Sequence, residues 1–137
     1  MLRIGLIVRN AEQTAKAYAD LLGIAAAPVR TVAPKEYADG STSNRSATLR
    51  TTSWAHQNGV EVELIEPVGG PSPWSEALQR QGGNAVHHLT FRAGDQFDAL
   101  IGLLQGKGGR LIYGRPGGTS AYLDFADTLG LAIELIP

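Results

Sequence analysis

Two segments of the sequence are nearly the same, and their repetition limits how the chain can fold. Residues 59–64 read GVEVEL and residues 130–135 read GLAIEL, so Glu63 and Glu134 occupy equivalent places. Each segment ends a stretch whose pattern predicts a strand, a helix and three further strands. Such a repeat indicates two pseudo-equivalent modules that bury their apolar faces together.

The first module is expected over about residues 1–68. Its expected elements are a strand at 2–9, a helix at 11–22 and strands at 24–30, 46–53 and 59–66. Asn10 and Gln13 form a capping-box pattern at the start of the helix, and Gly23 ends it. The segment Thr31–Arg45 is rich in Pro, Gly, Ser and Asn, which predicts a long loop and makes it a candidate lid.

A linker helix is expected within about residues 69–83, and the second module over about residues 84–137. The elements expected here are helices at 73–81 and 95–105 and strands at 85–93, 109–114, 119–125 and 129–136. Ser72 and Pro73 are typical of the first helix's N-terminus, and Asp95 is the expected cap of the second helix. At 137 residues the chain is long enough to form one domain with its own core.

Composition excludes several classes of function. The sequence has no cysteine, so it can form neither a disulfide nor a thiolate zinc site. Twelve basic and thirteen acidic residues give a net charge of −1, which argues against nucleic acid or an anionic membrane as the main partner. The start MLRIGLIVRN lacks the pattern of a signal peptide, and no apolar stretch approaches the ~20 residues of a membrane span. We therefore expect a soluble, cytoplasmic protein that binds a small molecule.

Alternation along the strands places one set of ionisable residues on the face away from the helices. This set comprises Arg3, Glu63, His88 and Glu134. His87, next to His88, is expected to point into the helix-covered core instead. If the two modules curl toward each other, the four residues line a cleft. A sheet with one solvated face would give the same pattern without any function.

Three stretches resemble the glyoxalase, bleomycin-resistance and extradiol-dioxygenase superfamily, also called the vicinal oxygen chelate superfamily. They are VELIEPVGGPSPWSEALQRQGG, the AVHHLTFRAGD that follows it, and the final GLAIELI. The methylmalonyl-CoA epimerase-like branch is the most similar. The resemblance covers essentially the whole chain and implies a single glyoxalase-like domain over residues 1–137. Its implied fold is α+β, with two tandem βαβββ modules around a barrel-like cleft, and its implied assembly is a homodimer.

The resemblance also implies a metal site that this sequence only partly retains. Glu63, His88 and Glu134 match the second, third and fourth ligand positions, but RIGLIV places Arg3 where relatives carry a ligand histidine. A guanidinium stays protonated and does not bind metals. Either the three remaining ligands hold a divalent ion (Zn, Ni, Co, Mn or Fe), or Arg3 pairs with the carboxylates and the site is metal-free. The second state is slightly favoured.

Two functions follow from the resemblance. One is a lyase or isomerase of a small carbonyl or thioester compound, with Glu134 transferring a proton and Arg3 or a metal as electrophile. The further carboxylate expected of an epimerase is missing from residues 46–53, which offer Ser46, Thr48 and Arg50. The alternative is a metal-free protein that binds a small molecule or antibiotic, as in resistance proteins. Aromatic residues available to line its pocket are Tyr37, Trp54, Trp74, Tyr113 and Tyr122.

Overall fold

The computed structural model describes residues 1–24, 27–37, 45–55 and 59–137. Its strands are β1 (Arg3–Ile7), β2 (Arg30–Tyr37), β3 (Arg45–Ala55), β4 (Glu61–Val68), β5 (Ala85–Arg92), β6 (Arg110–Gly114), β7 (Ala121–Phe125) and β8 (Leu131–Ile136). Its helices are α1 (Ala11–Leu22), α2 (Pro73–Arg80), α3 (Phe97–Gly106) and α4 (Ala126–Leu129), with a 3₁₀ turn at Gly94–Gln96. None of the helices in these ranges is long and apolar enough to cross a membrane.

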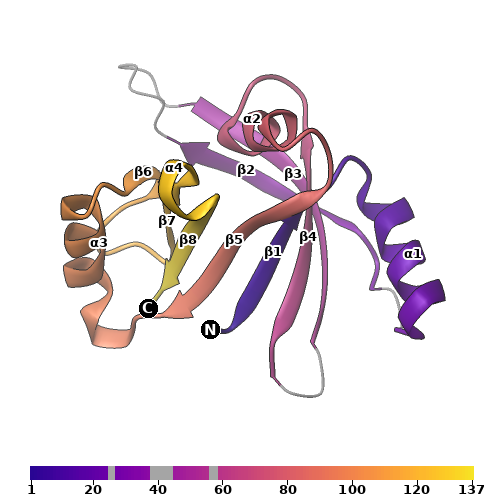
Figure 1. The fold of residues 1–137 in the computed structure, drawn as a ribbon, viewed down its shortest axis with the longest axis horizontal. Coiled ribbons are helices and arrows are strands. Elements are labelled where there is room, and N and C mark those ends of the chain that lie inside the picture. Colours follow the sequence, from indigo (N-terminus) through magenta and orange to yellow (C-terminus); the bar gives the residue numbers. More distant parts are fainter. Residues whose placement is uncertain (25–26, 38–44, 56–58) are drawn as a thin grey trace.

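The strands form a closed barrel in the order β1-β4-β3-β2-β6-β7-β8-β5. In each half, the first strand pairs in parallel with the last, β1 with β4 and β5 with β8. The halves join through antiparallel pairing of β1 with β5, and again where β2 meets β6 at the pair Tyr37↔Tyr113. Helices α1 and α3 lie on opposite sides of the barrel, and α2 lies across its upper end (Figure 1). The expected α+β fold of two βαβββ modules is confirmed.

The first module differs from expectation between residues 24 and 37. The predicted strand at 24–30 is wrong, because only Arg30 of the described residues there is in a strand. The predicted loop at Thr31–Arg45 is also wrong for residues 31–37, which belong to β2 and pair with β3. The register shifts between Val32 and Lys35, so a bulge accommodates Pro34, which has no N–H to donate. The rest of the candidate lid, residues 38–44, lies outside the described residues.

Capping residues in the sequence correctly predicted most of the helix ends. Asn10 Oδ1 accepts a hydrogen bond from the Gln13 backbone N–H at 2.9 Å, and α1 ends at Gly23 with a φ of 65°. Ser72 caps α2 in a capping box. The predicted cap by Asp95 is wrong: this residue lies in the 3₁₀ turn, and α3 begins at Phe97 without a side-chain cap.

The barrel's interior is apolar at the end covered by α2. Trp74 of α2 is fully buried against Ile7 of β1, Leu49 of β3 and Ile65 of β4. Its ring lies edge-on to the rings of Tyr113 and Tyr122, with centroids 5.9 and 6.1 Å away. Trp74 therefore belongs to the core and closes this end of the barrel, so polar chemistry is confined to the remaining interior.

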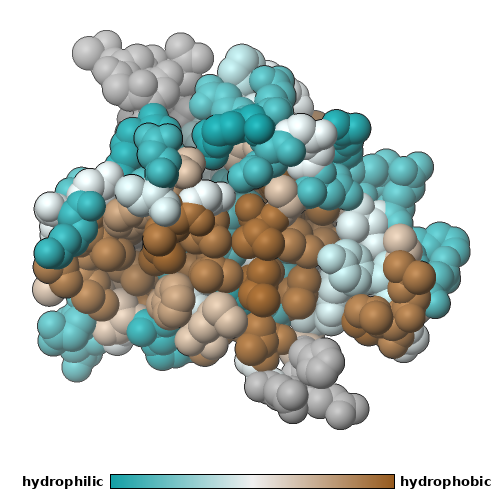
Figure 2. All heavy atoms as spheres, in the orientation of Figure 1, coloured by the Kyte–Doolittle hydropathy of each residue, from teal (hydrophilic) through white to brown (hydrophobic). Residues whose placement is uncertain are grey.

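Apolar side chains are also exposed on the outer surface of the second module. Figure 2 shows hydrophobic residues gathered on the side of α3 and β8, whereas hydrophilic residues cover α2. A groove of about 550 Å³ lies there, lined by Phe91, Leu100, Leu104, Lys107, Phe125, Thr128, Leu129, Ile133 and Leu135. Two leucines nearby, Leu103 and Leu129, are more than half exposed. The packing of α3 on the sheet thus leaves apolar surface in contact with solvent.

Candidate functional site

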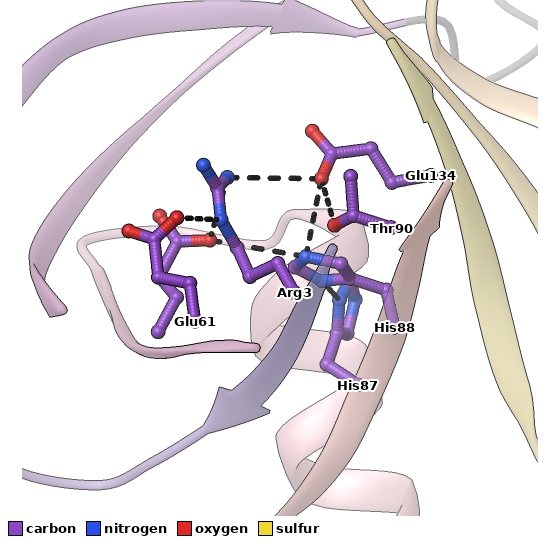
Figure 3. A network of polar contacts seen from close by, with 7 residues as sticks. Arg3, Glu61, His87, His88, Thr90 and Glu134 are labelled. Carbon is purple, nitrogen blue, oxygen red and sulfur yellow. Dashed lines mark hydrogen bonds and ion pairs between the residues drawn. The ribbon is translucent and has the colours of Figure 1, made fainter. Parts of the chain in front are cut away.

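The four ionisable residues expected to share a face meet inside the barrel. They come from four strands: Arg3 from β1, Glu63 from β4, His88 from β5 and Glu134 from β8. Figure 3 shows the side chains of Arg3, His88 and Glu134 converging, together with those of Glu61 and Thr90. Strand register explains the convergence, because Arg3 pairs with Glu61 and with Thr90, and Thr90 pairs with Glu134. Residues paired in this way point to the same face of the sheet.

Arg3 places a positive charge among three carboxylates. Its Nε donates to Glu61 Oε2 at 3.0 Å and its Nη1 to Glu63 Oε2 at 3.4 Å, while Nη1 lies 3.8 Å from Glu134 Oε2. Burial alone would lower the pKa of Arg3, but the charges of Glu63 and Glu61 raise it above the usual value. The guanidinium is therefore a fixed cation at the centre of the site.

Glu134 is the most enclosed of the carboxylates, with 4% of its side chain exposed. It accepts a 2.5 Å hydrogen bond from Thr90 Oγ1 and another from the Tyr122 hydroxyl, and His88 Nε2 lies 3.4 Å from its Oε2. Burial would raise the pKa of Glu134, but these contacts outweigh burial and lower it to about 2. Glu134 is therefore ionised at neutral pH.

Tyr122 is the phenol that stays protonated beside this carboxylate. Burial raises its pKa well above the usual value, and the negative charges of Glu134 and Glu63 raise it further. Its hydroxyl can therefore act only as a neutral hydrogen-bond donor or acceptor at ordinary pH. The sequence placed Tyr122 among possible pocket aromatics, and the structure places it against the carboxylate of Glu134.

The two adjacent histidines are closer than simple alternation predicts. His87 lies beneath α2, among Ala77 and Arg80, and His88 lies in the barrel, but their Nδ1 atoms are only 3.0 Å apart. A register shift in the pairing of β1 with β5, between Gly5 and Leu6, produces this arrangement. Burial and the neighbouring His88 lower the pKa of His87 to about 3, so its ring is neutral. One of the two facing nitrogens can then donate to the other.

Gly5 makes room for the imidazole of His88. A Cβ atom at position 5 would lie 2.0 Å from Cε1 of His88 and 2.3 Å from its Nδ1. The ring, which is fully buried, therefore lies directly over the backbone of β1. Sequence reasoning missed this role, although a glycine inside a strand pattern is itself a signal of a close approach. The sequence reasoning also did not identify Glu61 or Thr90 as site residues.

The donor set does not fit a divalent metal as it stands. His88 Nε2 lies 3.4 Å from Glu134 Oε2 and 3.8 Å from Glu63 Oε2, and it makes no well-aligned hydrogen bond with any described residue. Arg3 Nη1, however, lies within 3.8 Å of the same two carboxylate oxygens, and a cation there opposes a second cation. Within the described part of the chain, no group of three or more His, Asp or Glu side chains is arranged to hold a metal ion.

The barrel interior continues beyond Glu63 into a hollow of about 280 Å³. Its lining residues are Ala27, Pro28, Arg30, Thr51, Thr52, Ser53 and Glu63. The expectation that β3 offers Ser46, Thr48 and Arg50 to the cleft is wrong for Arg50, which points outward and binds Glu12 of α1 at 2.6 Å. Thr51 and Ser53 face the hollow instead. Trp54 also lies outside the barrel, against Tyr18 of α1, with ring centroids 5.0 Å apart.

Comparison with known proteins places the chain in a family. Residues 3–126 match the model of the Glyoxalase/Bleomycin resistance protein/Dioxygenase superfamily. The chain therefore belongs to this superfamily, as its sequence resemblance implied. No protein with a curated function matches the chain in sequence.

Solved structures share the fold over nearly all of the chain. Methylmalonyl-CoA epimerase from Streptomyces coelicolor, in complex with 2-nitronate-propionyl-CoA, is 22% identical with a TM-score of 0.61, covering 98% of this chain and 93% of its own. Methylmalonyl-CoA epimerase from Mycobacterium tuberculosis is 21% identical with a TM-score of 0.59, covering 98% and 84%. A hypothetical protein from Bacillus halodurans C-125 is 17% identical with a TM-score of 0.60, covering 98% and 90%. At these identities the likeness is one of fold.

Proposed function

We propose that this protein is a lyase or isomerase that moves a proton next to the carbonyl of a small carbonyl or thioester compound, with Glu134 as the proton-transfer group and Arg3 as the electrophile. The observation that carries the proposal is the contact inside the barrel between a permanent cation and a buried carboxylate, 3.8 Å apart. Fold relatives bound to CoA thioesters lend support. A small-molecule ligand suits this enclosed interior.

Arg3 and Glu134 can supply what such a reaction requires, which is stabilisation of the negative charge on the carbonyl oxygen and transfer of the proton. When the proton leaves the carbon beside the carbonyl, the electron pair of the C–H bond moves onto the carbonyl oxygen, and Arg3 beside that oxygen stabilises its negative charge. Glu134 accepts the proton, becomes a neutral acid, and can return the proton to carbon. Its low pKa makes it a weak base in the free protein. A substrate that covers the site excludes water, which raises the pKa of the carboxylate toward the value that transfer requires.

The residues around Glu134 orient it for this step. Thr90 and Tyr122 donate to the carboxylate, and His88 Nε2 lies 3.4 Å from Oε2, the oxygen that accepts from Thr90, so the carboxylate has a fixed position. Glu61 and Glu63 hold the guanidinium of Arg3 at the opposite wall. We assign no step to a metal, because Arg3 supplies the positive charge at this point. Glu63, His88 and Glu134 as ligands of a divalent ion form the competing proposal.

Isotope exchange tests the reaction directly. Methylmalonyl-CoA and 2-oxobutyrate are incubated with the protein in D₂O, and loss of the proton beside the carbonyl is followed by NMR. Exchange by the wild type should exceed the rate without protein. It should fall by roughly 100-fold or more in E134Q, since proton transfer by a positioned group contributes about that factor. Full exchange activity in E134Q would show that Glu134 is not the base.

A second candidate function is a binding protein without chemistry. The observation that favours it is the satisfied network around Glu134, whose pKa of about 2 is far from that of an efficient base. Tight binding of a carbonyl compound without any isotope exchange would support this alternative.

The assembly and location of the protein also stay proposals. We propose a homodimer, supported by the apolar groove between α3 and β8, which a second copy could cover. Light scattering on the purified protein tests it, and a monomer at micromolar concentration would contradict it. The cytoplasmic location is likewise a proposal, and cell fractionation tests it.

A further inference from the structure

The hollow beyond Glu63 has polar walls that the proposed reaction does not use. Its rim carries the exposed cation of Arg30, and its wall carries the hydroxyls of Thr51 and Ser53. These residues belong to β2 and β3, whereas the proton-transfer groups belong to β1 and β8. Their role is therefore separate from that of Glu134.

Strand pairing makes the hollow continuous with the reactive centre. Arg30 pairs with Thr51 across β2 and β3, and Ser53 pairs with Glu63 across β3 and β4. Glu63 in turn accepts a hydrogen bond from Arg3 at 3.4 Å. A ligand whose carbonyl oxygen meets Arg3 therefore extends along the inner wall, past Ser53 and Thr51, toward Arg30.

Thr52 fixes the rim of the hollow. Its side chain is on the outer face of β3, is nearly fully buried, and donates to the carbonyl oxygen of Ala27 at 3.1 Å. This bond ties the chain before β2 to the middle of β3, so Ala27 and Pro28 form a fixed edge. The shape of the hollow is thus held by hydrogen bonding within the first module.

The chemistry of the walls favours a carboxylate. A guanidinium presents several N–H donors in a fork that matches a carboxylate, and the two hydroxyls that line the same hollow can donate to such a group. Glu63 is the anion in the lining, and its charge is compensated by Arg3. The volume of about 280 Å³ is that of a small organic fragment.

We propose that this hollow is a subsite for a carboxylate of the substrate, bound by Arg30, Thr51 and Ser53. The inference rests on the proposed function and narrows its substrate class to small carbonyl or thioester compounds that also carry a free acid group. It makes Arg30 a residue that determines specificity and has no part in proton transfer.

Binding of two matched probes tests the subsite without relying on turnover. 6-Oxoheptanoate and its uncharged analogue 6-oxoheptanamide have nearly the same shape and carry the acid or amide group several carbons from the carbonyl. Their dissociation constants are measured by NMR titration. The wild type should bind the acid roughly tenfold more tightly than the amide, the difference made by one charged hydrogen-bonded contact. R30A should bind both probes equally weakly. R30K should recover part of the difference, because lysine supplies the charge but not the fork.

The matched control is K107A, which removes one positive charge from the outer groove beside α3. It should leave both dissociation constants unchanged. The subsite would be overturned if the wild type bound acid and amide equally, or if it did not bind the acid. It would also be overturned if R30A and K107A had equal effects. The isotope-exchange measurement tests the proposed reaction separately from the subsite. If the acid binds through Arg30 but shows no exchange that depends on Glu134, the subsite stands and the reaction is wrong.

Discussion

Replacing Gly5 by alanine should disturb the site through one methyl group. The new Cβ would lie 2.0 Å from Cε1 of His88, and ordinary contact begins near 3.4 Å, so the ring must move by about 1.4 Å (3.4 minus 2.0). It has little freedom to do so, since the His88 centroid lies 4.9 Å from that of Tyr122 and 5.3 Å from that of His87. Overpacking of this kind typically costs about 1–3 kcal/mol.

The free energy of unfolding is measured by urea denaturation for the wild type, G5A, H88A and the double variant G5A/H88A. We expect G5A to lose about 1–3 kcal/mol in the wild type but much less in the H88A background, because truncating the imidazole removes the clash. The coupling between the two substitutions should therefore be of the same size as the loss in G5A.

Gly102 of α3 provides the control. A Cβ there meets no atom within 4 Å, and its backbone is helical, so G102A should stabilise the protein by roughly 0.5–1 kcal/mol. The reasoning about Gly5 fails if G5A unfolds at the same urea concentration as the wild type. It also fails if the effects of G5A and H88A simply add.

Three further outcomes follow from the site and the core. The pKa of Glu134 is lower in the folded protein, about 2, than its ordinary value of 4.5, so its stabilising effect is complete above about pH 5 and is lost as the pH falls toward 2. Acid titration of stability should therefore show a loss of about 3 kcal/mol over this window that E134Q lacks, and parallel curves would contradict the assignment. R3H removes the cation and leaves three carboxylates beside His88, so it should bind Co²⁺ or Zn²⁺ at least roughly 100-fold more tightly than the wild type in calorimetry; equal affinities would show that Arg3 does not replace the metal. W74A should lose about 3–5 kcal/mol in urea denaturation, and a loss below about 1 kcal/mol would mean that Trp74 does not close the barrel.

The sequence correctly predicted that four ionisable strand residues share the inner face of the sheet. Arg3, Glu63, His88 and Glu134 lie in strands whose apolar partners alternate clearly, so a period of two assigned each to its face. The repeat around Glu63 and Glu134 then indicated that these faces meet, as the barrel's register shows.

Prediction failed where pairing partners, not local pattern, decide the structure. Residues 31–37 form β2 because β3 pairs with them around a bulge at Pro34. The stretch SATLRTTS lacks a clear hydrophobic alternation, so nothing local indicated that Thr51 and Ser53, not Arg50, face inward. The contact between His87 and His88 depends on a register shift opposite Gly5, and one strand alone carries no trace of its partner's register.

Among the residues that the structure describes, the two joins of the barrel are unequal, which indicates a hinge side and an opening side. Five register pairs hold β1 to β5, whereas in the described residues β2 meets β6 only at Tyr37↔Tyr113. Separating the described part of the second join breaks few hydrogen bonds and leaves each module's own sheet intact. A ligand larger than the resting interior is therefore expected to enter by swinging the modules apart about β1 and β5. The same asymmetry predicts that amide hydrogens along β6 exchange with solvent before those at the centre of β1.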